Sequence, residues 1–227
     1  MYAYPIMLQI RNAIEMNQRA RSRAMDITDL RGHILEIIEN MRNLIYDPPI
    51  GLDVYDATDF RFILAGYSWK FSEFKIWILQ YQKDINRFSF RTVSSHSKQT
   101  KGTKYFFFEG DNVNTARKRL YDILRGRNKM TVGGLDMEPF EVLRDMIRDP
   151  QFTSIGGPPQ MVKVYKHMNT LPYNVSWTNK DSKQITFLGR PLLPYEKNTF
   201  LVLDPDSLNI YNWQGEIIVN AADDNAA

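Results

Sequence analysis

The chain has no cysteine among its 227 residues. This absence excludes disulfide bonds, zinc sites built from thiolates and a cysteine nucleophile. The longest apolar runs fall short of the ~20 residues that a membrane-spanning helix needs. The first residues also carry no basic group ahead of their apolar stretch, which is untypical of a secretory signal. We therefore predict a cytoplasmic protein that makes no contact with a membrane.

The chain as a whole carries no large excess of positive or negative charge: its net charge is +3. So small an excess does not by itself indicate a nucleic-acid partner. The charge is unevenly distributed, however. Residues 98–129 hold nine Lys and Arg against three acidic residues, whereas residues 196–227 hold six acidic residues against one Lys. Opposite signs favour attraction between the two segments, within one molecule or between subunits.

Familiar catalytic and metal-binding motifs are scarce. The chain has no P-loop, no HExxH and no GxSxG motif, and the stretch from Gly66 to Lys70 lacks the second glycine of a nucleophile elbow. We therefore place Ser68 at the end of a strand. Single histidines and an acidic loop are too scattered or too irregular to predict a metal site: His33, His96, His167, Asp53, Asp56 and Asp59. We expect no metal and no cofactor.

The pattern of apolar residues predicts blocks of helices and strands. We expect helices over 5–23, 28–46 and 138–148, and another after Gly110-Asp111-Asn112 with Ala116, Leu120, Ile123 and Leu124 on one face. We expect strands over 60–69, 74–82, 88–92, 105–108, 161–168, 185–188, 200–203 and 217–219. Because helices and strands arrive in blocks, the sheets should be antiparallel and the class α+β. Residues 221–227 should form a disordered acidic end of the chain.

Three short sequence patterns follow one another along the chain, and their order is more specific than any one of them. The strand residues 61–66, Arg-Phe-Ile-Leu-Ala-Gly, precede the strand residues 74–77, Phe-Lys-Ile-Trp. Gly110-Asp111-Asn112 then joins a strand to a helix that contains Ala116. Ser154-Ile155-Gly156-Gly157 finally joins a helix to an apolar strand. In this order, over roughly residues 3–190, the chain resembles the proteasome-type N-terminal-nucleophile (Ntn) hydrolases.

The resemblance implies an αββα sandwich with antiparallel sheets. It places residues 1–195 in the Ntn-like domain and residues 196–227 in a C-terminal extension. The chain opens on what looks like the first helix of the family, so the resemblance implies that the N-terminal strands, which carry the nucleophile, lie outside this chain. Met1 cannot replace a Thr, Ser or Cys nucleophile. An edge left by missing strands predicts a partner chain or a homo-oligomer.

The function implied is a subunit of a threonine-type peptidase or amide hydrolase. Gly110, Asp111, Gly156 and Gly157 would then line the site for a peptide or amide substrate. Asp111 is one candidate for a catalytic role. Thr103 is a second candidate, because it follows Gly102 and self-cleavage there would free an amine as the base for its own hydroxyl.

Two other functions stay open at this stage. The same fold could serve as a non-catalytic scaffold or ring subunit. Alternatively, the basic segment 98–129 could bind nucleic acid through its cations and the aromatic residues 105–108. We consider a nucleic-acid partner the weaker hypothesis, because consecutive aromatic residues cannot all face one side of a strand.

Overall fold

The computed structural model describes residues 3–44, 61–93, 106–131, 134–166, 169–179 and 182–219. Contacts divide the chain into two compact units. Unit 1 holds residues 1–94 and 164–169, and unit 2 holds residues 95–163 and 170–227. The domain limits expected from the sequence, 1–195 and 196–227, remain a prediction, although strands beyond residue 195 are hydrogen-bonded into a sheet with strands before it.

The helices of unit 1 are α1 (Ala3–Met16), α2 (Gln18–Arg21) and α3 (Ile27–Asn43). The sequence predicted one helix over 5–23, but the helix is interrupted at Asn17. The Asn17 side chain accepts hydrogen bonds from the backbone N–H groups of Arg19 and Ala20, and so starts a second short helix. Asn competes with the helical backbone in this way because its short side chain reaches nearby N–H groups. The prediction for 28–46 is confirmed within a few residues.

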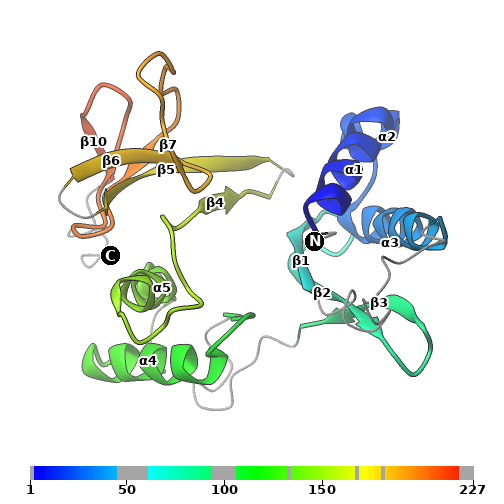
Figure 1. Cartoon of the computed structure of the whole chain (residues 1–227), viewed down its shortest axis with the longest axis horizontal. Coiled ribbons are helices and arrows are strands. Elements are labelled where there is room, and N and C mark those ends of the chain that lie inside the picture. The colour runs from blue at the N-terminus through cyan, green and yellow to red at the C-terminus, as the bar shows by residue number, and fades with distance from the viewer. Residues whose placement is uncertain are drawn as a thin grey trace, which may run out of the picture. The chain divides into compact units, whose positions relative to one another are not determined.

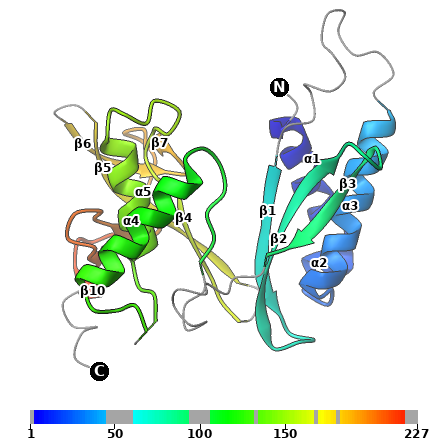
Figure 2. The ribbon, with the colours of Figure 1, turned by 90° about the horizontal axis from the view of Figure 1, so that it is seen from below.

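The sheet of unit 1 is antiparallel and has the order β1-β2-β3. Its strands are β1 (Arg61–Ser68), β2 (Glu73–Gln82) and β3 (Arg87–Thr92), close to the predicted strands. Helices α1 and α3 lie on one face of this sheet (Figure 2). The buried core between them contains residues from both layers: Ile6, Ile34, Ile38, Leu79 and Phe88.

Gly66 lies where the first residue of α3 packs against β1. A Cβ atom at position 66 would lie 2.0 Å from Cδ1 of Ile27, the first residue of α3. A side chain at position 66 would therefore force the end of the Ile27 side chain to move. Close packing, rather than an unusual backbone angle, favours glycine here.

The helices of unit 2, α4 (Val113–Gly126) and α5 (Glu138–Arg148), pack against each other. Their shared core holds Ala116, Leu120, Leu124, Val142 and Met146. A strand was predicted over 105–108, but residues 106–108 form none. Phe106 and Phe108 instead pack on the helix pair, and the ring of Phe106 meets the edge of Tyr121 at 5.7 Å. Aromatic residues favour strands only where a sheet offers a surface for them.

The second sheet belongs to unit 2. Its strands are β4 (Met161–Val164), β5 (Thr170–Asn179), β6 (Ser182–Phe187), β7 (Arg190–Pro191), β8 (Val202–Leu203), β9 (Ile210–Tyr211) and β10 (Ile217–Val219). The order is β10-β9-β8-β5-β6-β7, and β4 also pairs with β5. Antiparallel sheets were expected, but β5 and β8 are parallel, so this sheet is mixed. A long connection returns the chain to the same direction beside β5, which local patterns do not reveal.

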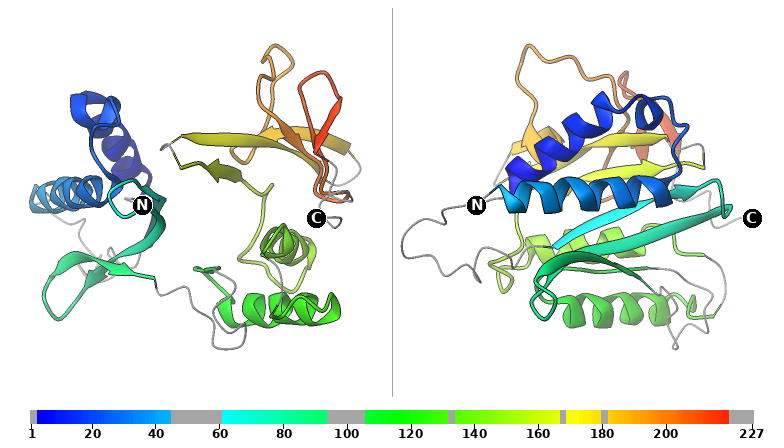
Figure 3. Two further views of the ribbon diagram at one scale, coloured as in Figure 1. Left: turned by 180° about the vertical axis from the view of Figure 1, so that it is seen from behind. Right: turned by 90° about the vertical axis from the view of Figure 1, so that its right-hand side faces the viewer.

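Helices α4 and α5 lie on one side of the second sheet (Figure 3). Contacts from α5 fix this arrangement. The guanidinium group of Arg148 lies 4.9 Å from the centre of the Trp177 ring on β5, and Arg144 donates to the carbonyl of Pro205 at 2.7 Å. Each unit thus combines one helix layer with one sheet (Figure 1), and the α+β class is confirmed. Among the described residues, no helix is long and apolar enough to cross a bilayer.

Candidate functional site

The turn before α4 carries Asp111, the main catalytic candidate from the sequence. Gly110 has a φ of 115° and Asn112 a φ of 59°. Glycine adopts such angles without strain, and Asn tolerates the left-handed region better than most residues. The two residues reverse the chain so that Asp111 is exposed just ahead of the helix. A carboxylate there stabilises the positive end of the helix dipole, whether or not it has a chemical role.

Gly156 and Gly157 form an exposed turn between α5 and β4. Gly157 has a φ of 79°, and an added Cβ would meet no atom within 4 Å at either glycine. The loop before this turn is anchored on the α4–α5 pair, since Phe152 and Ile155 pack against the helix core. Both sequence-predicted turns thus belong to unit 2 and flank the same helix pair. Within the described ranges, no hydrogen bond or ion pair joins them.

Asp149 also anchors this loop. Its carboxylate accepts a hydrogen bond from Arg119 on α4 at 2.6 Å, and Arg119 lies over the ring of Phe152 at 4.9 Å. The hydrogen bond from Arg119, followed by one from the backbone of Gln151, lowers the pKa of Asp149. Asp149 therefore remains ionised at neutral pH and holds the loop against the helix, a role that does not leave it as a general acid.

Several sequence candidates fall outside the described residues. These are Thr103, His96, His167, Asp53, Asp56 and Asp59. His33 lies on α3. In the part of the chain that the structure describes, no group of three or more His, Asp or Glu side chains is arranged to hold a metal ion.

Ser68 lies at the end of β1, as predicted, and is completely buried. Its hydroxyl donates to both carboxylate oxygens of Asp26, at 3.0 and 3.1 Å. The same hydroxyl accepts a hydrogen bond from the backbone N–H of Phe71 at 3.3 Å. The serine is thus a structural link between a strand end and a helix start, and the carboxylate that accepts its hydrogen bond is a weak base, because its pKa is lowered to about 2.

Asp26 is the centre of this arrangement. It caps α3 by accepting from the backbone N–H of Thr28 at 2.9 Å. The carboxylate also accepts from the hydroxyl of Thr28 and from the backbone N–H groups of Trp69 and Lys70. Five donor groups, including Ser68, therefore surround one buried carboxylate. Its partners at the end of β1 and in the following turn are more than forty residues away in the sequence. No local sequence pattern therefore predicts these contacts.

Burial and hydrogen bonding have opposite effects on the pKa of Asp26. Burial raises the pKa, but the hydrogen bonds from Thr28, Lys70 and Ser68 together outweigh it and lower the pKa from 3.8 to about 2. Donors that stabilise the carboxylate but not the carboxylic acid have this effect. Asp26 is therefore ionised at every pH at which the protein is expected to work.

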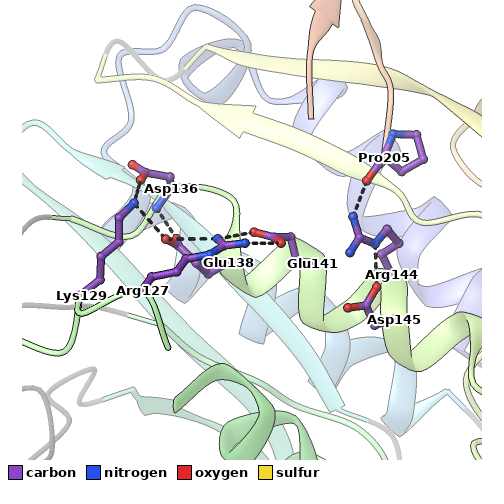
Figure 4. A network of polar contacts seen from close by, with 8 residues as sticks. All are labelled: Arg127, Lys129, Asp136, Glu138, Glu141, Arg144, Asp145 and Pro205. Atoms are coloured by element: carbon purple, nitrogen blue, oxygen red, sulfur yellow. Dashed lines mark hydrogen bonds and ion pairs between the residues drawn. The ribbon is translucent and has the colours of Figure 1, made fainter. Parts of the chain in front are cut away.

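A second buried charge network joins the end of α4 to the start of α5 (Figure 4). Arg127 donates to both oxygens of Glu141 at 2.7 Å, and Lys129 donates to Asp136 at 2.7 Å and to Glu138 at 3.2 Å. Glu138 and Glu141 are buried. The hydrogen bond to Glu141 raises the pKa of Arg127, and the one to Asp136 raises the pKa of Lys129.

These ion pairs bear on the basic segment 98–129. Six of its nine basic residues are described, and four of those six form ion pairs with carboxylates: Arg119, Arg125, Arg127 and Lys129. A cation already paired with a carboxylate gains less from a phosphate group, because the existing pair must first be broken. The positive charge counted in the sequence therefore overstates the charge that this segment offers to nucleic acid.

Comparison of the chain with models of protein families, with curated proteins and with solved structures finds no match.

Proposed function

We propose that this chain is a subunit of a proteasome-like assembly with an Ntn-hydrolase-like αββα fold. One observation carries the proposal: each unit consists of a helix layer on one face of a sheet. An αββα sandwich is built from two such pairs of layers that meet sheet to sheet. The order along the chain, helices then sheet followed by helices then sheet, is the order that the sequence resemblance implies.

The position of Gly66 supports the same proposal. The resemblance rests partly on the stretch that ends in this glycine, and the structure gives the glycine a physical function there. It allows Ile27 at the start of α3 to touch the backbone of β1. A motif residue with a specific packing role supports the resemblance better than sequence identity at that position alone.

In this proposal, the chain forms one wall of a site for a peptide or amide. The exposed turns around Asp111 and Gly156 offer backbone N–H groups and a carboxylate to an extended substrate. The nucleophile is a residue outside the described ranges, and it attacks the carbonyl carbon while backbone amides stabilise the oxyanion. Asp111 contacts the substrate or orients the attacking group.

The test begins with the native complex. We expect native mass spectrometry to find an oligomer, and fluorogenic peptides to be hydrolysed by it. Replacement Asp111→Ala should lower kcat/KM by about tenfold or more, equivalent to about 1.4 kcal/mol of transition-state stabilisation. Asp122→Ala is the matched control, because Asp122 lies on α4, the helix that follows Asp111, and forms an exposed ion pair with Arg125. An active complex that tolerates Asp111→Ala fully would remove Asp111 from the site.

A non-catalytic scaffold of the same fold is the second candidate, and the buried charges favour it. Asp26, Glu138 and Glu141 are saturated by hydrogen bonds that hold elements together. An oligomer that hydrolyses no peptide and reacts with no electrophilic inhibitor of threonine peptidases would support the scaffold and refute the peptidase. Retention on DNA or RNA that weakens steeply with salt would instead support a nucleic-acid-binding module.

A further inference from the structure

The turn between β1 and β2 exposes aromatic side chains at one end of unit 1. Trp69 and Phe71, in the turn, are 49% and 60% exposed, and Phe74, near the start of β2, is 55% exposed. Aromatic rings of this size are usually buried, or lie where part of the ring meets another molecule. Three exposed rings within six residues therefore indicate an interaction surface rather than scattered surface positions.

Hydrogen bonds hold this turn in one conformation. The buried carboxylate of Asp26 accepts from the backbone N–H groups of Trp69 at 2.9 Å and of Lys70 at 3.3 Å. The buried hydroxyl of Ser68 accepts from the backbone N–H of Phe71 at 3.3 Å. Because the turn is already ordered, it loses little conformational entropy when a partner covers it.

A group of exposed arginines lies at the same end of unit 1. Arg19 and Arg21, in α2, and Arg23, just after it, form no ion pair with a described residue. The backbone carbonyl of Arg19 accepts from the N–H of Met25 at 3.1 Å, which brings the group next to Asp26. Since Asp26 also holds the turn between β1 and β2, the arginines and the aromatic rings belong to one end of the unit (Figure 2).

The charge that this end offers to a partner is positive. Lys70 pairs with Asp29, and Lys75 pairs with Glu73, so these four charges offset one another. Asp26 is buried and surrounded by donors. The three arginines of the group are exposed and unpaired among the described residues. They attract an anionic surface.

We propose that this basic and aromatic surface binds the face of a bilayer that contains anionic lipids. It consists of Arg19, Arg21, Arg23, Trp69, Phe71 and Phe74. The guanidinium groups pair with lipid phosphates, while the rings enter the boundary between headgroups and acyl chains. The sequence-based prediction of no membrane contact was drawn from the lack of a spanning segment and of a signal, and binding at the membrane surface requires neither.

Contacts of the aromatic rings favour lipid over single-stranded nucleic acid. Nζ of Lys70 lies 5.9 Å from the centre of the Trp69 ring, and Nζ of Lys75 lies 4.8 Å from the centre of the Phe71 ring. A nucleic-acid base stacks flat on a ring, and a lysine above the ring occupies one of the faces that stacking uses. Entry of a ring into the headgroup layer needs no open face, and a lysine beside it can reach a phosphate.

The test is co-sedimentation of the full chain with lipid vesicles. We expect binding to vesicles of phosphatidylcholine mixed with phosphatidylserine, and little binding to phosphatidylcholine alone. Added salt should weaken the binding, because ions screen the attraction. Arg21→Ala should weaken it about fivefold. The matched control is Arg117→Ala, at an exposed arginine of α4 that forms no ion pair with a described residue, and it should bind as the wild type does.

A second pair of variants tests the aromatic part of the surface. Phe71→Ala removes the most exposed of the three rings and should weaken vesicle binding about tenfold or more. The matched control is Ile85→Ala, at a side chain that is 48% exposed in the turn between β2 and β3, and it should leave binding unchanged. Circular dichroism of each variant checks that it folds.

Two results of these measurements would overturn the proposal. The first is a wild-type chain that fails to bind the anionic vesicles, or one whose binding falls equally in the variants and in their controls. The second is tighter binding to a single-stranded oligonucleotide than to the vesicles, lost in Arg21→Ala and Phe71→Ala, which would assign the surface to nucleic acid. The inference goes beyond the proposed function and does not rest on it, because vesicle binding is measured without a peptidase readout.

Tryptophan fluorescence gives a measurement that locates the contact. Of the four tryptophans in the chain, Trp77 and Trp177 are buried, whereas Trp69 and Trp213 are exposed. Vesicles with brominated acyl chains should therefore quench the fluorescence of Trp213→Phe, which keeps Trp69. They should have little effect on Trp69→Phe, which keeps Trp213 and an aromatic ring at position 69. Quenching that is equal in the two variants, or absent from Trp213→Phe, would contradict binding through this turn.

Discussion

The replacement Asp26→Asn tests the buried carboxylate that joins α3 to the turn between β1 and β2. Asn has the same size, but one carboxylate oxygen becomes an NH₂ group. Whichever way the amide points, a donor then faces the N–H of Thr28 or the N–H groups of Trp69 and Lys70, all of which now donate to Asp26. Leaving buried donors unpaired costs about 1–3 kcal/mol each. We expect a loss of about 2–4 kcal/mol in the free energy of unfolding.

The pKa of Asp26 gives a second, independent estimate of the same quantity. The shift from 3.8 to about 2, at about 1.4 kcal/mol per unit, is equivalent to about 2 kcal/mol in favour of the ionised form. Because the pKa is lowered in the folded state, this stability is fully present above pH 3.8. It is lost as the pH falls through 3.8 toward 2. The difference between wild type and Asp26→Asn should therefore shrink by about 2 kcal/mol between pH 5 and pH 2.

Urea unfolding followed by tryptophan fluorescence measures both effects, since Trp69 and Trp77 lie next to the turn and in β2. Asp29→Asn is the matched control. Asp29 is in the same helix turn and forms an exposed ion pair with Lys70 at 2.6 Å, so its loss should cost less than about 1 kcal/mol. If Asp26→Asn were no more destabilising than this control, or if the difference from wild type did not change with pH, the assignment of Asp26 as a buried link would be wrong.

Three further predictions concern single positions. Gly66→Ala should destabilise unit 1 by about 1–3 kcal/mol in urea unfolding, because its Cβ would overlap Cδ1 of Ile27; Ile27→Val, which removes that atom, should recover part of the loss in a double-mutant cycle. Glu141→Gln breaks a bidentate ion pair of a buried carboxylate and should lower the free energy of unfolding by about 1–3 kcal/mol, measured in the same way. Gly157→Ala should cost about 1 kcal/mol because φ is 79°, whereas Gly156→Ala, in open space and without a positive φ, should change the midpoint of thermal unfolding little.

The elements that the sequence predicted well are those whose signals are local. The start of α3 follows from an Asp beside an apolar stripe, and β1 and β2 follow from two aromatic and β-branched runs separated by a polar turn. Each element is encoded within about twenty residues. The signal for the interruption at Asn17 is also local, since Asn is a common N-cap residue. It was missed because the helical spacing of the surrounding apolar residues continues through Asn17.

The misses arise where distant parts of the chain decide the structure. Residues 106–108 have strand-forming side chains, yet α4, which follows them, pairs with α5 and gives them a different surface to pack on. Strand β5 was not predicted, although Tyr173, Val175 and Trp177 alternate along it and are buried; Pro172 weakened the strand signal. The strand predicted over 200–203 contains β8, but its parallel pairing with β5 could not be predicted, because two residues carry no pairing pattern.

In the candidate site, too, the sequence identified local features and missed contacts between distant residues. The sequence marked Asp111 and the two glycine turns, and the structure shows them as exposed turns of unit 2 beside one helix pair. It did not mark Asp26 with Ser68, or Glu141 with Arg127, because these pairs join residues across elements. Hydrogen bonds lower the pKa of Asp26 to about 2, so this carboxylate stays ionised and does not transfer protons at neutral pH. The proposed function therefore assigns chemistry to exposed groups such as Asp111, while the buried charges join strand and helix ends within each unit.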